Sequence, residues 1–172
     1  MFQRIVGVLK RIPFCIKTHN KIKNVRLLGK VHLKNKNVVC EGKVTLCDGV
    51  KILGNGRVVF GNNTFIADNT IIFSTKEGEE IVFGDDVMVA ANCYFVNATH
   101  NAAVCDIPMI KQGVSGAPIK ICNDVWICEG VTVLHGVTIG GGCIIGAKSL
   151  VKHTCDENSV YVGIPCKKIK NR

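Results

Sequence analysis

Hydrophobic residues recur every six positions in the second half of the chain. From Ile121 the sequence reads ICNDVW, ICEGVT, VLHGVT, IGGGCI, IGAKSL and VKHTCD, and each of these hexads begins with an aliphatic residue. The fifth position of each hexad is small or β-branched: Val125, Val131, Val137, Cys143, Ser149 and Cys155. The same phase occurs from Phe60 and again from Phe83. Hexads in a common register predict a repeat architecture.

Each hexad predicts one short strand followed by a turn. The aliphatic residue points inward, and the small residue at the fifth position fits a narrow interior. Strands from successive coils then stack in parallel, about 4.8 Å apart. Residues 25–59 alternate apolar and polar positions without a clean hexad phase, which predicts less regular coils. No amphipathic helix is visible after residue 20, which argues against a doubly wound α/β fold. We therefore expect an all-β parallel solenoid over residues 25–166.

Composition and charge fit this interpretation. Only 6% of the residues are aromatic, as expected for a narrow interior, and the formal net charge is +9. Residues 1–36 carry ten Lys and Arg and no acid, residues 37–166 carry eight basic and 13 acidic groups, and residues 167–172 carry four basic groups. A nucleic-acid-binding domain usually spreads basic groups over a folded face, interleaved with aromatics. An acidic body between basic ends argues against nucleic-acid binding.

The N-terminus has no uninterrupted apolar stretch of the kind that a secretory signal requires, because Arg4, Lys10, Arg11 and Pro13 divide it. A run of about 18 apolar residues that could span a bilayer is also absent from the sequence. We therefore expect a cytoplasmic protein. The ten cysteines include no CxxC pair, which argues against a zinc ribbon and favours small buried hydrophobic residues in a reducing compartment.

The helical spacing of apolar residues over residues 2–12 predicts a short amphipathic helix within a basic N-terminal segment, residues 1–24. The apolar face of this helix would hold Phe2, Ile5, Val6, Leu9 and Ile12. Packing against the solenoid or a neighbouring subunit is one role for it. Peripheral contact with an anionic membrane surface is the other.

Three stretches carry a family resemblance: NATHN at 97–101, PIKICNDVWICEGVTVLHGVTIGGGCIIGAKSLV at 118–151 and YVGIPCKKIK at 161–170. They resemble the hexapeptide-repeat acyltransferases, in particular the maltose, galactoside and xenobiotic O-acetyltransferase branch, over about residues 58–170. The resemblance implies a left-handed parallel β-helix with acetyl-CoA as donor and no metal. It also implies a homotrimer with each active site between neighbouring subunits.

His100 stands where the hexad phase breaks. The next hexad in phase starts at Ile121, so we expect residues 101–117 to form a loop that leaves the coil and walls off a site. An imidazole with a pKa near about 6.5 can take the proton of an attacking hydroxyl and return one to a departing thiolate. A lone loop histidine is more often structural, but by the resemblance His100 is the general base.

Two cysteines flank His100 and keep an acyl-cysteine route open. Cys93 occupies an inward fifth position, where we expect a buried thiol with a raised pKa. Cys105 lies in the predicted loop and stays a candidate nucleophile. We favour direct transfer in a ternary complex, in which a backbone N–H stabilises the tetrahedral oxyanion.

The resemblance also implies donor-binding residues near the end of the chain. Gly146 and Ala147 of the IGA turn would contact the pantetheine arm of coenzyme A, and Lys167 and Lys170 would contact its phosphates. On charge alone, these lysines equally fit a solvated basic tail, residues 167–172.

Two further residues complete the predicted donor site. Asn69 in IADNTI aligns with the family's asparagine near the thioester. Trp126 falls at the outward sixth position of its hexad, so we expect it to wall the donor or acceptor cleft.

The acceptor is less well defined than the donor. Ser74 and Thr75 replace the aspartate pair that contacts sugar in the galactoside enzymes, so a simple galactoside is not expected. We predict O-acetylation of a carbohydrate, from a cell-surface polysaccharide or its precursor. The alternatives are N-acetylation of an amino sugar, acetylation of a small antibiotic and a non-catalytic trimer scaffold. His135 and His153, one coil apart, would also suit a zinc site like that of carbonic anhydrases with the same fold, if a third ligand converged on them.

Overall fold

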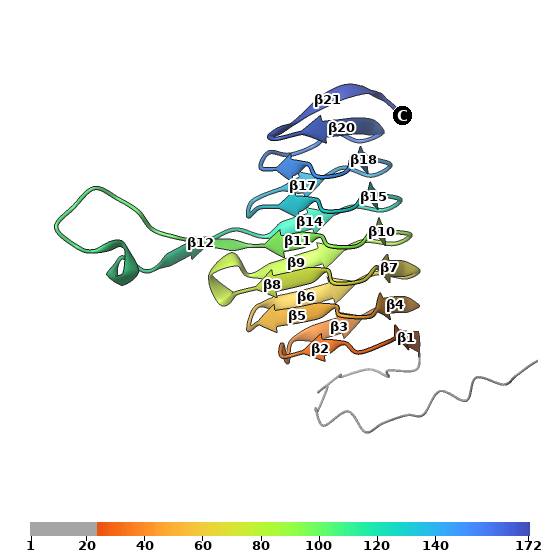
Figure 1. The fold of residues 1–172 in the computed structure, drawn as a ribbon, viewed down its shortest axis with the longest axis horizontal. Helices are drawn as coiled ribbons and strands as arrows, with labels where there is room; N and C mark the ends of the chain where they lie inside the picture. The colour runs from red at the N-terminus through yellow and green to blue at the C-terminus, as the bar shows by residue number, and fades with distance from the viewer. Residues whose placement is uncertain (1–23) are drawn as a thin grey trace, which may run out of the picture.

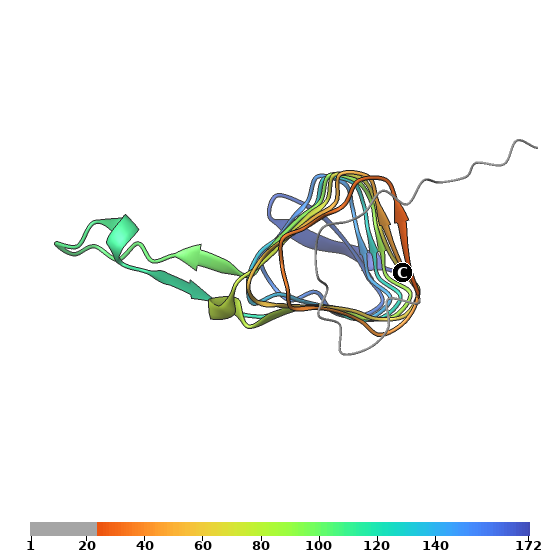
Figure 2. The same cartoon turned by 90° about the horizontal axis from the view of Figure 1, so that it is seen from below.

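Each clear hexad forms one short strand and one turn, as the period predicts. The computed structural model describes residues 24–172. Within them, β15 (Trp126–Ile127), β16 (Thr132–Val133) and β17 (Thr138–Ile139) follow one another along the chain and lie in three different sheets. One coil of the solenoid therefore takes three hexads, and its cross-section is a triangle (Figure 2).

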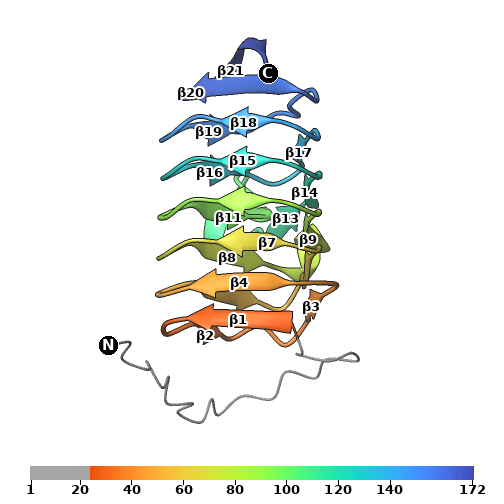
Figure 3. The ribbon, with the colours of Figure 1, turned by 90° about the vertical axis from the view of Figure 1, so that its right-hand side faces the viewer.

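Three sheets form the faces of the triangle (Figures 1 and 3). The first sheet contains β1 (Val25–Leu28), β4 (Val44–Cys47), β7 (Thr64–Ile66), β10 (Met88–Val89), β15, β18 (Ile144–Ile145), β20 (Ser159–Gly163) and β21 (Cys166–Asn171). The second contains β2 (His32–Leu33), β5 (Lys51–Gly54), β8 (Ile71–Ser74), β11 (Tyr94–Val96), β16 and β19 (Leu150–Val151). The third contains β3 (Val38–Cys40), β6 (Arg57–Phe60), β9 (Glu80–Phe83), β14 (Ile119–Ile121) and β17. Pairing within them is parallel except for β21, which is antiparallel to β20.

The coil is left-handed, as the resemblance implies. It rises from its N-terminal end in Figure 1, and Figure 2 views it from that end. Seen in this way, the chain passes anticlockwise from the first sheet to the second and third as it recedes from the viewer.

The core is a narrow column inside the triangle. The residues that begin the hexads are fully buried, and those at the fifth positions are at most 2% exposed. Three phenylalanines extend this column: the rings of Phe60 and Phe83 stack with centroids 5.1 Å apart, and Phe83 meets Phe95 edge-on at 5.0 Å. The inward positions read from the period are thereby confirmed.

The first coils are longer than the later ones. Val25 pairs with Val44 and Val44 with Thr64, so these coils exceed by one or two residues the three-hexad coil that joins Trp126 to Ile144. The extra residues are accommodated in turns, which explains why residues 25–59 form strands of the same sheets without a hexad phase.

The sheets meet at corners, where the chain turns from one face of the triangle to the next. Corner 1 joins the first sheet to the second, and corner 2 joins the second to the third. At corner 1 one residue of each coil has a positive φ: Gly29, Gly49, Asn69, Asn92, Gly130 and Lys148. Backbone hydrogen bonds of about the same length place these turns above one another.

The predicted loop at residues 101–117 is a structured arm that leaves the coil at corner 2 (Figures 1 and 2). Strands β12 (Ala98–His100) and β13 (Val114–Gly116) pair antiparallel in it, and η3 (Met109–Lys111) lies near its end. A second short 3-10 helix, η2 (Lys76–Gly78), packs beside β13. The arm thus begins three residues earlier than the sequence predicts and has paired edges at its base.

The C-terminal residues predicted as a basic tail lie largely in β21, which closes the solenoid. The guanidinium of Arg172 donates a hydrogen bond to the carboxylate of Asp124 at 2.7 Å and so anchors the end of the chain. The amphipathic helix predicted over residues 2–12 lies outside the described residues. Among residues 24–172, no helix has the length and apolar character needed to cross a membrane.

Candidate active site

His100 is the last residue of β12, opposite Val114 of β13. Its side chain is exposed, and its imidazole forms no hydrogen bond within residues 24–172. Two-stranded pairing continues beyond it, because the Asn101 amide N–H donates to the carbonyl of Gly113 at 3.0 Å. The histidine is therefore held on a paired strand that projects from the coil while its ring stays open to solvent.

Asn97 fixes the point at which the arm leaves the coil. Its side chain is fully buried: the amide oxygen accepts a hydrogen bond from the Thr75 N–H at 2.8 Å, and the amide nitrogen donates to Ser74 Oγ at 3.2 Å. Its carbonyl accepts from the Ala117 N–H at 3.1 Å, which joins the two ends of the arm. Sequence reasoning missed this positioning residue, although its place at the phase break, three residues before His100, was a signal for it.

The end of the arm is held by Gln112. The side-chain oxygen of Gln112 accepts a hydrogen bond from the Ala103 N–H at 2.8 Å, and its nitrogen donates to the carbonyls of Ala103 and Ile107 at 2.9 and 2.7 Å. Around this polar centre the apolar side chains point to solvent: Val104, Ile107, Met109 and Ile110 are each more than half exposed. The arm is ordered by hydrogen bonds and leaves its apolar side chains uncovered by its own chain.

Three of the predicted donor residues lie together at corner 1, at the C-terminal end of the coil. The Gly146 N–H donates a hydrogen bond to the carbonyl of Tyr161 at 2.8 Å, and Val162 pairs in register with Lys167 on β21. A Cβ on Gly146 would lie 2.6 Å from Cγ1 of Val162, so a larger residue here would have to displace the partly exposed Val162 side chain. Ala147 is exposed beside it, and Lys167 is exposed two strands away.

Trp126 and Lys170 lie on the first sheet. Trp126 points outward with 45% of its surface exposed, as its position in the hexad predicts. Its register partners on the neighbouring strands are Met88 on one side and Ile144 on the other. Ile144 in turn pairs with Val160 on β20, and Val160 pairs with Lys170 on β21. An exposed aromatic side chain and a lysine are thus separated by two apolar residues on one face.

Asn69 lies at corner 1, three coils before Ala147. Its φ of 57° is in the left-handed region, and its side-chain oxygen packs over Gly49 of the preceding coil. Asparagine tolerates this conformation well, so the turn itself accounts for the residue type. The structure does not bring Asn69 next to Gly146.

The two cysteines that flank His100 in the sequence differ in environment. Cys93 is 1% exposed, and burial raises the pKa of its thiol; its Sγ donates to the carbonyl of Cys128 at 3.2 Å. Cys105 is exposed on the arm, where its Sγ donates to the carbonyl of Ile107 at 3.7 Å. The buried thiol predicted for Cys93 is confirmed. Over residues 24–172, no cluster of three or more His, Cys, Asp or Glu side chains that could hold a metal ion is present.

The residues predicted to act together are separated within one chain. His100 is on the arm at corner 2, whereas Gly146, Ala147 and Lys167 are at corner 1, and the arm points away from the first sheet (Figure 2). A single chain therefore does not bring the predicted general base, His100, to the predicted donor residues.

Residues 118–153 match the family described as bacterial transferase hexapeptide (six repeats). The chain is a hexapeptide-repeat protein related to acetyltransferases. It is 33% identical to the probable acetyltransferase Rv3034c of Mycobacterium tuberculosis over 144 residues, which are 83% of this chain and 42% of that protein. It is 44% identical to the sophorolipid acetyltransferase of Starmerella bombicola over 107 residues, 62% of this chain and 40% of that one. The hexapeptide-repeat protein thus spans less than half the length of these two curated relatives.

Solved structures show the same fold. A mutant of AntD, an N-acyltransferase from Bacillus cereus in complex with dTDP-4-amino-4,6-dideoxyglucose and coenzyme A, superposes with a TM-score of 0.74 and 28% identity, over 87% of this chain and 82% of that one. The resemblance to hexapeptide-repeat acyltransferases is confirmed by these findings. The assignment to the maltose, galactoside and xenobiotic branch stays a prediction.

Proposed function

We propose that this hexapeptide-repeat protein transfers an acetyl group from acetyl-CoA to a hydroxyl of a carbohydrate, with His100 as general base. The observation that carries the proposal is the placement of His100: an exposed imidazole without a hydrogen-bonding partner in residues 24–172, on a strand that leaves the coil. None of the hydrogen bonds that hold the arm, residues 98–116, uses this imidazole, so it is free to accept a proton from a bound acceptor. The acetyltransferase relatives and the coenzyme A bound by AntD support the donor.

In the proposed step, the neutral imidazole of His100 accepts the proton of the acceptor hydroxyl as its oxygen attacks the thioester carbonyl. The tetrahedral intermediate collapses with cleavage of the C–S bond, and the imidazolium returns the proton to the thiolate of coenzyme A. The acetyl group ends on the acceptor oxygen, so no acyl-enzyme intermediate forms. The burial of Cys93 supports this direct route.

The donor would lie at corner 1. We propose that Gly146 and Ala147 contact the pantetheine arm and that Lys167 and Lys170 bind the phosphates. Trp126 would form a wall of the same cleft. Asn69 keeps its proposed role near the thioester only if the donor extends three coils along this corner.

N-acetylation of an amino sugar is the second candidate. AntD, at 28% identity, is an N-acyltransferase in complex with an amino sugar nucleotide. An amine acceptor would use the same base and donor. For the hydroxyl acceptor, we propose a cell-surface polysaccharide or its precursor.

The separation of His100 from corner 1 supports a homotrimer in which neighbouring subunits share each site. A mixing experiment tests this: His100→Ala and Ala147→Trp chains are each expected to be inactive alone. Mixed trimers refolded from equal amounts should recover about a quarter of wild-type activity, since that share of sites combines two intact halves. Mixtures that stay as inactive as the separate variants would show that the halves are not shared.

The activity itself is tested by thiol release from acetyl-CoA with candidate acceptors. His100→Ala is expected to lower acceptor-dependent release by about 10²–10⁴-fold, the usual contribution of a general base. His32→Ala, which removes a histidine from β2 of the first coil, is the matched control and should keep wild-type activity. Full activity in His100→Ala would exclude the proposed mechanism. The mass shift of the product identifies the acceptor, and its alkaline lability separates an ester from an amide.

We further propose a cytoplasmic location with peripheral membrane contact through residues 2–12. Deleting residues 1–20 should lower binding to anionic liposomes and leave transfer to a soluble acceptor unchanged. Unchanged liposome binding would remove the membrane contact from the proposal.

A further inference from the structure

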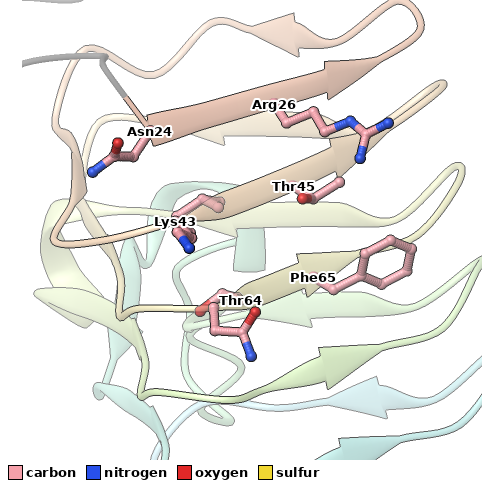
Figure 4. Close-up of a pocket in the computed structure, with 8 residues that line it drawn as sticks. Asn24, Arg26, Lys43, Thr45, Thr64 and Phe65 are labelled. Carbon is pink, nitrogen blue, oxygen red and sulfur yellow. The ribbon is translucent and has the colours of Figure 1, made fainter.

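The first three coils contain a depression of about 290 Å³ on the outer face of the first sheet, away from the arm (Figure 4). The lining side chains come from three neighbouring strands, β1, β4 and β7, and from the residue just before each of them. Those that carry the inference are Asn24, Arg26, Lys43, Thr45, Asn63 and Phe65. Asn24 and Lys43 lie at one end of the strands, and Arg26, Thr45 and Phe65 at the other (Figure 4).

Two cations face this depression without a carboxylate to neutralise them. Neither Arg26 nor Lys43 forms an ion pair within residues 24–172. Residues 1–23, which precede Asn24 in the chain, contain six basic residues and no acidic one, so they supply no carboxylate either. One acid lies close by: Asp86, in the next coil, accepts a hydrogen bond from the Asn63 amide at 2.8 Å. The neutral Asn63 amide leaves the negative charge of Asp86 in place, and two cations against one acid still make the depression net positive.

The remaining groups are those that recognise a sugar. The ring of Phe65 is 39% exposed and presents an apolar surface. The Asn24 amide and the Thr45 hydroxyl form no side-chain hydrogen bond within the described residues and can pair with hydroxyls. An arginine fork can bind a carboxylate or phosphate through two parallel hydrogen bonds, and a lysine adds a point charge.

From this arrangement we propose a subsite for an anionic saccharide, whose carboxylate or phosphate pairs with Arg26 while its ring rests on Phe65 at the same end of the strands, and Lys43 adds positive charge at the other end. The inference rests on the proposed acetyl transfer to a carbohydrate and names the acceptor class as acidic. Phe65 pairs in register with Met88, and Met88 with Trp126, so the subsite is continuous with the proposed cleft wall. Two strand spacings, about 10 Å, separate Phe65 from Trp126. The depression would therefore hold a part of the acceptor that is not acetylated.

Binding is measured calorimetrically on the full chain with four probes: tri-galacturonate, glucose 1-phosphate, maltotriose and inorganic phosphate. We expect one of the two acidic sugars to bind and maltotriose not to. The Arg26→Ala/Lys43→Ala variant should weaken that binding at least about tenfold, since charge-assisted hydrogen bonds are lost. Lys51→Ala removes a cation from β5 on the second sheet and is the matched control, which should bind as the wild type does. Tri-galacturonate binding would identify a carboxylate source, and glucose 1-phosphate binding a phosphate source.

Equal binding of maltotriose, equal binding of inorganic phosphate alone, or unchanged affinity in the double variant would overturn the subsite. The His100→Ala variant should bind the acidic sugar normally, because the depression and the arm are on different parts of the coil. If binding follows these expectations while His100→Ala keeps its transfer activity, the subsite stands and the proposed mechanism fails. With an active acceptor of the same class, the double variant should raise KM and leave kcat unchanged.

Discussion

The coil and the arm of this protein are stabilised in different ways. The coil buries an aliphatic residue in every hexad and repeats the same contacts from one layer to the next. The arm, residues 98–116, keeps its apolar side chains exposed and relies on strand pairing at its base and on the hydrogen bonds of Gln112 at its end. The proposed base stands on the part that contributes little buried surface. Its function and the stability of the fold are therefore expected to respond to different substitutions.

The largest loss of stability is expected inside the coil. Ile127 is fully buried in β15, and Ile127→Ala removes three carbons from a column that cannot collapse around them. The cost is expected to be about 2–5 kcal/mol of unfolding free energy. Urea unfolding followed by circular dichroism measures it. A cost below about 1 kcal/mol would mean that the coil does not carry the stability.

The joint between coil and arm should show an intermediate effect. Asn97→Ala leaves the Thr75 N–H without its acceptor, and the expected cost is about 1–3 kcal/mol. Activity should fall further than this loss of stability explains, because the arm that carries His100 loses its anchor. Asn97→Asp keeps an acceptor for the Thr75 N–H but buries a charge and loses the donor to the Thr75 carbonyl, so it should be no more stable than Asn97→Ala. Equal activity in Asn97→Ala and wild type, measured well below the unfolding temperature, would remove the positioning role.

Alkaline pH should weaken the coil by a smaller amount. Burial raises the pKa of the Cys40 thiol to about 11, and the pKa values of Cys93 and Cys143 are also raised by burial. Above about pH 8.5 the unfolded chain releases these protons while the folded chain keeps them, so stability present at lower pH is lost as pH rises toward 11. Thermal melts between pH 8 and 10.5 should show a falling Tm. The Cys40→Ala variant, with one fewer buried thiol, should show a shallower fall; an identical slope would exclude Cys40 as a source.

The smallest effect is expected at the end of the arm. Ile110 is 84% exposed, and Ile110→Ser should change the unfolding free energy of the isolated chain by less than about 0.5 kcal/mol. The same urea titration as for Ile127→Ala gives a direct comparison of one isoleucine in each region. A cost of about 2 kcal/mol or more would show that the arm is covered in solution, as a shared interface between subunits would require.

Prediction from the sequence succeeded where the repeat is strict. The inward positions from Ile121 to Val151, the outward position of Trp126 and the buried thiol of Cys93 all follow from the phase of the hexads. It was incomplete where the phase breaks. Residues 101–117 were expected as a loop, and the pairing of His100 with Val114 was not visible, because antiparallel partners fourteen residues apart leave no period in the sequence.

The all-β solenoid, its core and the histidine at the phase break follow from the residues alone, since a six-residue period dictates which side chains face the interior. Folding adds three features that the period does not predict: residues 166–171 close the solenoid as a strand, Asn97 anchors the arm, and His100 and Gly146 lie at different corners. It also placed Arg26, Lys43 and Phe65 around one depression. Stacking brings together residues a whole coil apart, and coil lengths run from 16 residues to 38 in the coil that carries the arm, so these neighbours are fixed only once the turns have formed.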